Sequence, residues 1–300
     1  MVSDYPERAP IYLAGPTGCG KTGVALEIAR LSHAPIEVVN ADAYQIYAGL
    51  EILSAAPTPE ERVECPHHLF GTIPLSEELD ASRYAEMARS ILAEIVARGA
   101  TPLVIGGSGL YLKSLTHGLA DVPKGDPDLR AELDELGFEE LVARYLKADP
   151  AGAAETNLKN RRYVTRNLEI TLLAGQPASE LKATFAGQRP DIRAVTLVRE
   201  RAELYERINQ RTFDMFDDGV VEEVERVLVS GALSTTAERA IGLREISDLI
   251  AGTLTREEAI STIQQSTRRY AKRQLNWFRR EGFPQVAPSA EAVLQVIGEV

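Results

Sequence analysis

Apolar and polar residues follow one another along the first third of the chain in blocks that predict strands and helices in turn. Short apolar runs at residues 11–14, 36–42 and 101–105 are typical of strands that are buried in a parallel sheet. Residues 23–31 and 81–98 carry their apolar side chains at helical spacing. This order of elements predicts an α/β fold in which helices flank a parallel sheet.

The middle of the chain has a different pattern. Residues 121–186 contain no convincing strand, and helical patterns occur at 128–136, 138–146 and 160–173. Gly175 follows the last of these patterns as a helix C-cap. We interpret residues 118–191 as an all-helical insertion domain.

The strand and helix pattern returns after the insertion. Residues 192–198 are typical of a strand that rejoins the sheet, and residues 201–211 follow with helical spacing. The remainder is predominantly helical to about Phe283. We therefore expect residues 1–117 and 192–300 to form one core domain with a helical C-terminal part.

Residues 49–74 interrupt the first part of the core with many proline and turn-forming residues, which predict an irregular loop over the active-site edge. This stretch contains adjacent histidines, His67 and His68. No second pair of ligands stands at a spacing suited to a metal, so we expect these histidines to pack or to form hydrogen bonds.

A glycine-rich motif lies between the first apolar run and the first predicted helix. It consists of Gly15, Pro16, Thr17, Gly18, Cys19, Gly20, Lys21 and Thr22. A strand, this loop and a helix in direct succession are the setting of a P-loop, whose backbone N–H groups bind phosphate oxygens. Lys21 supplies a positive charge and the Thr22 hydroxyl is suited to ligate Mg²⁺. The motif predicts a P-loop NTPase-like core that binds a di- or triphosphate.

The run at residues 36–42 ends in Asp42. Ligands of parallel sheets bind at the carboxyl ends of the strands, so we expect Asp42 to face the same crevice as the P-loop. A general base is the functional interpretation, and an N-cap of a helix that begins near Ala43 is the structural one.

The run at residues 101–105 ends in Gly106, Gly107 and Ser108 rather than in an acidic residue. In an ATP-hydrolysing motor an acid at this place organises magnesium. Its absence counts against such a motor and favours small groups that contact a diphosphate closely.

Two arginines of the helix at 201–211 lie one turn apart. Arg207 and Arg211 can therefore point the same way, toward a diphosphate. An intrahelical ion pair with Glu203 is the competing use, and it fits Arg207 better than Arg211.

Composition narrows the class of protein. The chain has 300 residues, a formal net charge of −11 and two cysteines. No apolar run approaches the roughly 20 residues that span a bilayer, and residues 1–10 lack the apolar core of a signal peptide. We expect a cytoplasmic enzyme with no membrane association, no disulfide framework and no zinc site.

Basic residues are concentrated in two places despite the acidic total. One cluster lies in the insertion, at Lys159, Arg161, Arg162 and Arg166, and another at residues 268–280, where six basic side chains alternate with aromatic ones. Solvated helix faces and core aromatics are the simplest explanation. Contacts with an RNA backbone and unstacked bases are the alternative.

Several of these stretches together resemble the tRNA dimethylallyltransferases, also called tRNA isopentenyltransferases. The matching stretches span nearly the whole chain in the expected order, at residues 15–22, 40–47, 106–111, 240–242 and 268–279. The resemblance implies transfer of a dimethylallyl group from dimethylallyl diphosphate, with Mg²⁺, to N6 of the adenosine immediately 3′ of the anticodon. The partners that it implies are the tRNA anticodon stem-loop and dimethylallyl diphosphate, bound by a monomer.

The resemblance also implies roles for individual residues. Lys21, Thr22 and Arg211 would neutralise the departing diphosphate, and Asp42 would accept a hydrogen bond or a proton from the adenine amine. Matches to the tRNA-contacting stretches of the family are Asp42, Ala43, Tyr44, Gln45, Ser108, Arg130, Arg162, Arg166, Arg239, Arg244, Lys272, Arg273 and Arg279.

The chain departs from the usual family pattern at a few positions. Ala43 and Tyr44 stand where Ser and Met are common, Ala56 replaces a lysine, and Ser108 replaces a threonine. Arg162 and Tyr163 occupy the place of a Gln-Arg pair. These departures affect the expected tRNA contacts and leave Lys21, Thr22, Asp42 and Arg211 in place.

Two other enzymes share part of the pattern. An adenylate isopentenyltransferase would prenylate free AMP or ATP, and a small-molecule P-loop kinase would use Asp42 as the base for a hydroxyl acceptor. The long helical insertion and the basic C-terminal stretch favour tRNA as the acceptor.

Overall fold

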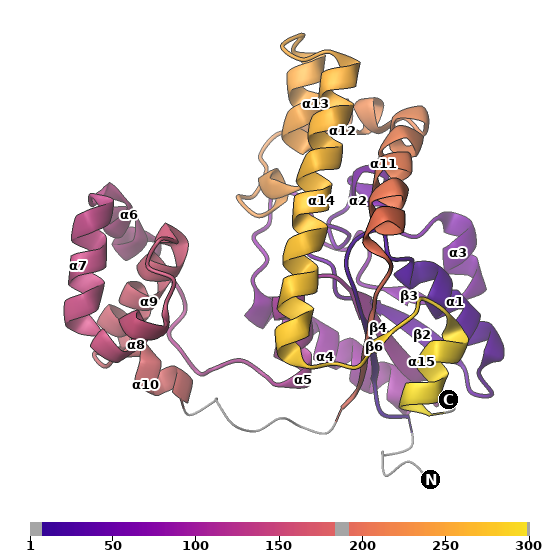
Figure 1. Ribbon diagram of the computed structural model, residues 1–300, viewed down its shortest axis with the longest axis horizontal. Coiled ribbons are helices and arrows are strands. Elements are labelled where there is room, and N and C mark those ends of the chain that lie inside the picture. The colour runs from indigo at the N-terminus through magenta and orange to yellow at the C-terminus, as the bar shows by residue number, and fades with distance from the viewer. Residues whose placement is uncertain (1–7, 184–191, 299–300) are drawn as a thin grey trace. The chain divides into compact units, whose positions relative to one another are not determined.

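The computed structural model describes residues 8–183 and 192–298 and divides into two compact units (Figure 1). Unit 1 comprises residues 1–116 and 191–300, and unit 2 comprises residues 117–190. These boundaries each lie one residue before those that the sequence pattern indicated. Residues 184–191 of the predicted insertion lie outside the described residues.

Unit 1 is built on a parallel sheet. Its strands are β1 (Ile11–Ala14), β2 (Ile36–Asn40), β3 (His67–His68), β4 (Thr101–Gly106), β5 (Arg193–Leu197) and β6 (Gln285–Val286). They lie in the order β3-β2-β4-β1-β5-β6, and every neighbouring pair is parallel. The predicted α/β fold with a parallel sheet is confirmed.

Successive side chains of β1 pack against helices on opposite faces of the sheet. Ile11 and Leu13 belong to a core cluster with residues of α1 (Lys21–Leu31) and α15 (Ala290–Ile297). Tyr12 is close to Tyr84 of α4 (Ala81–Ala97), which stacks on Tyr111 of α5 (Gly109–Thr116) with ring centroids 4.1 Å apart. Because successive strand side chains point to opposite faces, the two helix pairs cover opposite sides of the sheet.

Four helices continue unit 1 beyond the sheet, and Figure 1 shows them beside one another above the carboxyl edge of the strands. They are α11 (Arg201–Asp217), α12 (Val220–Ser230), α13 (Leu243–Ile250) and α14 (Arg256–Glu281), with a short 3₁₀ helix at Ala237–Arg239. The sequence pattern therefore located the helical C-terminal part but not the edge strand β6 and helix α15 that follow it.

The prediction that residues 49–74 form an irregular loop was wrong. They contain α2 (Glu51–Ser54), α3 (Pro59–Glu64) and β3. Local capping explains α3, since Thr58 and Glu61 form a reciprocal capping box around Pro59. Tertiary contacts explain α2, because the Glu223 carboxylate accepts hydrogen bonds from the N–H groups of Ile52 and Leu53, both at 2.8 Å.

The adjacent histidines form hydrogen bonds, as predicted. His67 Nδ1 lies 2.5 Å from the Cys65 carbonyl, and His68 Nε2 lies 2.6 Å from the Glu37 carboxylate. Within the described residues, no group of three or more His, Cys, Asp or Glu side chains is arranged to hold a metal ion.

Unit 2 consists of helices in its described part. They are α6 (Pro127–Glu135), α7 (Phe138–Ala148), α8 (Pro150–Glu155), α9 (Arg161–Ala174) and α10 (Ala178–Ala183). Leu133, Leu141, Tyr145, Val164 and Leu168 form most of its own apolar core. Gly175 ends α9 in the left-handed conformation that the sequence predicted.

None of the helices in the described ranges, 8–183 and 192–298, has the length and apolar character that crossing a bilayer requires.

A buried carboxylate in unit 2 collects several donors. Glu169 is fully buried and accepts hydrogen bonds from Arg130 at 2.8 Å, from Arg166 at 2.7 Å and from the N–H of Asp126 at 2.9 Å. Burial opposes its ionisation, but these donors outweigh burial and lower the pKa of Glu169 below its ordinary value.

We predict that Glu169→Gln destabilises unit 2 by about 1–3 kcal/mol at pH 7, because two arginines lose a charged acceptor. A lowered pKa means that this stabilisation is complete above the ordinary carboxyl pKa and is lost as the pH falls through the lowered value. Hydrogen exchange of α9 amides in urea, at pH 7 and at acidic pH, measures the difference.

Glu140→Gln is the matched control, because Glu140 and its partner Arg144 are both exposed in α7. Equal effects of the two substitutions at pH 7 would contradict the role assigned to Glu169.

Candidate active site

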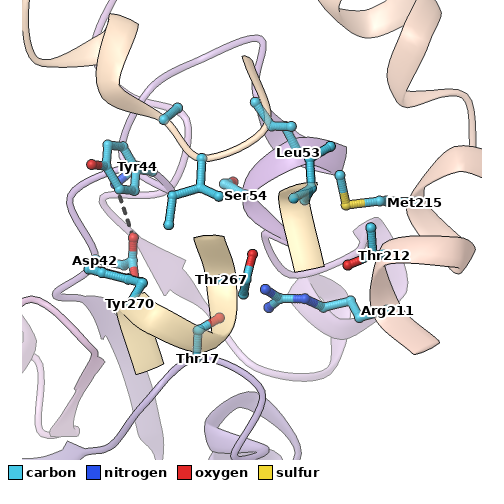
Figure 2. A pocket seen from close by; sticks show the side chains of 13 residues that line it. Thr17, Asp42, Tyr44, Leu53, Ser54, Arg211, Thr212, Met215, Thr267 and Tyr270 are labelled. Atoms are coloured by element: carbon cyan, nitrogen blue, oxygen red, sulfur yellow. Dashed lines mark hydrogen bonds between the residues drawn. The ribbon is translucent and has the colours of Figure 1, made fainter. Parts of the chain in front are cut away.

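A cavity lies in unit 1 at the carboxyl ends of the strands, between the sheet and helices α11 and α14 (Figure 2). Its polar side is formed by the loop after β1, the segment after β2 and side chains of the two helices. Its apolar side is formed by residues of α2, α11, α14 and the segment before α13. The lining residues are Thr17, Asp42, Tyr44, Leu53, Ser54, Arg211, Thr212, Met215, Ala240, Ile241, Ile263, Thr267 and Tyr270.

The strand order brings the predicted site residues together. β4 lies between β1 and β2, so the P-loop, the Asp42 segment and the glycine turn after β4 emerge side by side. The turn is close to the Asp42 segment, since a Cβ added at Gly106 would lie 2.1 Å from the Ala41 carbonyl oxygen. The Ser108 N–H donates to the same oxygen at 3.1 Å.

The P-loop backbone has the curvature that phosphate binding requires. Gly18 and Gly20 have φ angles of +81° and +97°, which residues with a Cβ rarely adopt. Lys21 Nζ donates to the carbonyls of Gly15 and Pro16, both at 3.0 Å, so the lysine lies along the loop. Thr22 lies in the first turn of α1, directly after this loop.

Two arginines bind the outward-facing carbonyls of the loop. Arg207 Nε donates to Gly18 O at 3.0 Å, and Arg199 Nε donates to Cys19 O at 2.9 Å. The expected alternative, an ion pair between Arg207 and Glu203, was wrong. Glu203 instead pairs with Arg199, which enters from the segment before α11.

Arg211 reaches into the cavity from α11, and in Figure 2 its guanidinium points toward Thr17 and Thr267. Burial lowers the pKa of this guanidinium, Asp42 opposes the shift, and Arg207 adds to it. The interaction with Asp42 places a cation and an anion on the walls of one cavity. The positive charge of Arg211 would stabilise the binding of an anionic ligand in this cavity.

The backbone of Asp42 is fixed by Asn40, which is fully buried at the end of β2. Asn40 Nδ2 donates to Leu69 O at 2.9 Å and to Asp42 O at 3.1 Å, and Asn40 Oδ1 accepts from the Asp42 N–H at 2.8 Å. Asp42 Oδ1 accepts from the Tyr44 N–H at 3.0 Å, as Figure 2 shows. The Asp42 carboxylate thus accepts from a following N–H as an N-cap does. The N-cap interpretation was nevertheless wrong, because residues 43–46 form turns and no helix begins there.

Ser108 and Tyr270 support the same segment. Ser108 Oγ accepts from the Ala43 N–H at 2.8 Å, and the Tyr270 side chain lies near Ser108. Burial raises the pKa of the Tyr270 hydroxyl, and the nearby Asp42 carboxylate raises it further. The phenol is therefore neutral and remains a hydrogen-bonding group at the cavity wall.

The residues that match tRNA-contacting stretches differ in their surroundings. Ala43 and Tyr44 lie at the cavity or next to it, whereas the Gln45 amide donates to the carbonyls of Ser54 and Ala55 at 3.2 and 2.7 Å. Arg130 and Arg166 bind Glu169. Arg162, Arg239, Arg244, Lys272, Arg273 and Arg279 are exposed, and so is Arg130 despite its ion pair.

Three residues of α14 contribute to the site although the sequence did not single them out. Thr267 and Tyr270 line the cavity, and Gln274 contacts the P-loop. Their spacing of three and four residues places them on one helix face, which is the available sequence signal. The sequence indicated basic and aromatic residues of this helix as RNA contacts or core, but not this polar face toward the cavity.

The donors near the loop fit a divalent cation that is held largely by phosphate. Mg²⁺ commonly keeps several waters and takes one or two protein ligands together with substrate phosphates. The Thr22 hydroxyl beside the P-loop could serve as such a ligand, and the cation would need no cage of carboxylates.

We predict that Asn40→Leu lowers the free energy of unfolding of unit 1 by at least about 1–3 kcal/mol, because the buried Leu69 carbonyl loses its donor. It also releases the Asp42 backbone, so the Tyr44 amide should exchange faster with solvent. Urea unfolding and hydrogen exchange measure the two effects.

Asn40→Asp is the companion variant, since it keeps an acceptor for the Asp42 N–H and loses only the amide donor. Wild-type stability and unchanged Tyr44 exchange in Asn40→Leu would show that Asn40 does not fix this segment.

The chain is similar to known proteins over nearly its whole length. A family model described as IPP transferase matches residues 45–281. The tRNA dimethylallyltransferase of Akkermansia muciniphila is 42% identical over 280 residues, which are 93% of each chain. The tRNA dimethylallyltransferase 1 of Syntrophotalea carbinolica is 40% identical over 289 residues, which are 93% of this chain and 91% of that protein.

A solved structure agrees with these matches. The full-length tRNA isopentenylpyrophosphate transferase of Bacillus halodurans superposes with a TM-score of 0.69 at 31% identity, over 97% of this chain and 94% of that one. The P-loop-like fold and the resemblance that the motifs indicated are thereby confirmed. The chain belongs to the IPP transferase family.

Proposed function

We propose that this chain transfers a dimethylallyl group from dimethylallyl diphosphate to N6 of the tRNA adenosine immediately 3′ of the anticodon, with release of diphosphate. The observation that carries the proposal is a cavity whose lining includes both Arg211 and Asp42, beside a P-loop. One wall suits an anionic leaving group and the other suits an amine nucleophile. The names of the relatives that match over most of the chain support the same reaction.

The two sides of the cavity suit the two parts of the donor. The diphosphate would bind the backbone N–H groups of the P-loop, with Lys21 and Arg211 as counter-charges. The five-carbon chain would lie against the apolar side, which Leu53, Met215 and Ile263 help to form. Burial of that chain stabilises binding through the hydrophobic effect.

Thr22 is the residue that we propose as a ligand of Mg²⁺. When bound, the cation would neutralise part of the charge on the diphosphate.

The proposed step is a displacement at the prenyl C1 carbon. A bond forms between adenine N6 and C1, while the bond between C1 and the diphosphate oxygen breaks and its electron pair leaves with diphosphate. Asp42 accepts the proton that N6 loses. Arg211 stabilises the charge that develops on the leaving group, and the fixed backbone of Asp42 keeps its carboxylate aimed into the cavity.

The acceptor must leave its base stack to reach such a cavity. α14 carries Lys272, Arg273 and Arg279 on its exposed face, next to the residues that line the cavity. We propose that this face binds the tRNA backbone and that Arg162, beside the exposed Tyr163 in unit 2, makes further contacts. We further propose that the chain acts as a monomer on tRNA of the cytoplasm.

Incubation of the protein with labelled dimethylallyl diphosphate and either tRNA or AMP tests the acceptor. We expect label in tRNA and none in AMP, because AMP lacks the backbone that the exposed basic face would bind. Label in AMP alone would favour an adenylate isopentenyltransferase. Phosphate transfer from ATP to a small hydroxyl compound, without prenyl transfer, would favour a kinase.

We predict that Asp42→Asn lowers kcat for prenyl transfer by about 10²–10⁴-fold, the range for loss of a general base. The asparagine oxygen still accepts from the Tyr44 N–H, so the turn should persist and the KM for dimethylallyl diphosphate should change little. Steady-state kinetics with each substrate varied measure the split. A variant that turns over near the wild-type rate would remove Asp42 from the mechanism.

A further inference from the structure

Gln274 of α14 connects two loops of the active site through its side-chain amide. Its Oε1 accepts a hydrogen bond from the Thr17 N–H at 2.9 Å, and its Nε2 donates to the Gly107 carbonyl at 2.9 Å. The residue is 5% exposed, so both bonds are shielded from water. One side chain thus joins the P-loop to the turn after β4.

The absence of a side chain at position 107 makes this connection possible. A Cβ added there would lie 2.1 Å from Gln274 Nε2 and 3.3 Å from the Gly15 carbonyl oxygen. The carbonyl of Gly107 also fixes the orientation of the amide, because only the NH₂ group can donate to it. The amide oxygen must therefore face Thr17.

The bond to Thr17 changes which donors the P-loop has available. The Thr17 N–H is occupied by Gln274, and the Cys19 N–H is directed to the Pro16 carbonyl at 3.3 Å. The N–H groups of Gly18 and Gly20 meet no acceptor among the residues that the structure describes. The phosphate cradle is therefore confined to the second half of the loop, next to the N-terminus of α1.

A direct contact between Gln274 and tRNA does not fit these observations, although its neighbours Lys272 and Arg273 are exposed. Its amide is buried and has both a donor and an acceptor partner. It lies on the same helix face as Thr267 and Tyr270, which line the cavity.

We propose that Gln274 is a positioning residue, which holds the first half of the P-loop against the turn after β4 and so orients the remaining N–H groups toward the donor diphosphate. The identity of that diphosphate rests on the proposed function. Loss of the amide would weaken diphosphate binding without affecting the acceptor. A merely structural residue would change stability and leave the affinities of the folded protein unchanged.

Gln274→Met tests the proposal, because methionine fills a similar volume and forms neither hydrogen bond. We expect the Kd for inorganic pyrophosphate in the presence of Mg²⁺, measured by calorimetry, to rise about tenfold, because the loop that Gln274 no longer holds must be ordered when the ligand binds. The KM for dimethylallyl diphosphate should rise to a similar extent, while the KM for tRNA stays within about twofold.

Two further variants keep the test decisive. Gln274→Glu retains an acceptor for Thr17 but cannot donate to Gly107, so it should also weaken pyrophosphate binding, and it replaces Gln274→Met if that variant does not fold. Gln265→Met places the same substitution on an exposed position of α14 with no side-chain partner in the described residues, and it should bind pyrophosphate as the wild type does.

Folded Gln274 variants with wild-type affinity for pyrophosphate would overturn the proposal, and so would a rise in the KM for tRNA alone. Pyrophosphate binding is measured without prenyl transfer. A wild-type protein that binds pyrophosphate but shows no transfer would refute the proposed function and still test Gln274.

Discussion

The parallel pairing of β4 between β1 and β2 is the constraint on which the active site depends. It fixes the separation of the P-loop and the Asp42 segment, which follow the two outer strands of this group. The turn after β4 must fit between them, and the glycine at position 106 provides the room, since the Ala41 carbonyl occupies the place of a Cβ. An acidic side chain at this point would be forced into the same crowded space. The close packing of the strand ends thus explains why β4 ends in glycine, where the corresponding strand of a motor ATPase ends in an acidic residue.

Helix α14 completes the site, and its buried and exposed faces have different roles. The buried face supplies Thr267 and Tyr270 to the cavity wall and Gln274 to the loops, while the exposed face carries the basic residues. Buried polar groups are costly unless they are hydrogen-bonded, and here each amide atom of Gln274 has a partner. The buried face of this helix would therefore contact the bound prenyl donor, and its exposed face would bind the tRNA backbone.

Local patterns in the sequence were sufficient for the parts of the site that depend on local structure. A glycine loop between a strand and a helix identifies the P-loop, and a carboxylate at the end of the next strand identifies Asp42. Partners from distant segments were not predictable in this way. Gln274, for example, meets Thr17 across more than 250 residues of sequence. Even a local choice was ambiguous, because Glu203, named as a competing partner for Arg207, pairs instead with Arg199 four residues before it.

Basic residues show the same limit. The presence of an arginine in the sequence does not show whether it binds RNA or stabilises its own domain. Arg130 and Arg166 match tRNA-contacting stretches, and the structure shows both on the buried Glu169 carboxylate. Their charge is thus partly compensated within unit 2, although Arg130 is exposed just as Arg162 and Lys272 are. Helix α2 was likewise not predictable from its own sequence, because its N-terminal N–H groups bind Glu223 of α12, about 170 residues further along the chain.

The central claim is that the P-loop of this chain holds a leaving group and not a phosphoryl group in transfer. Quantifying inorganic pyrophosphate together with prenylated nucleoside in one reaction tests it most directly. The account predicts one pyrophosphate released for each N6-dimethylallyladenosine formed in tRNA. Release of orthophosphate, or a phosphorylated acceptor without a prenyl group, would contradict it.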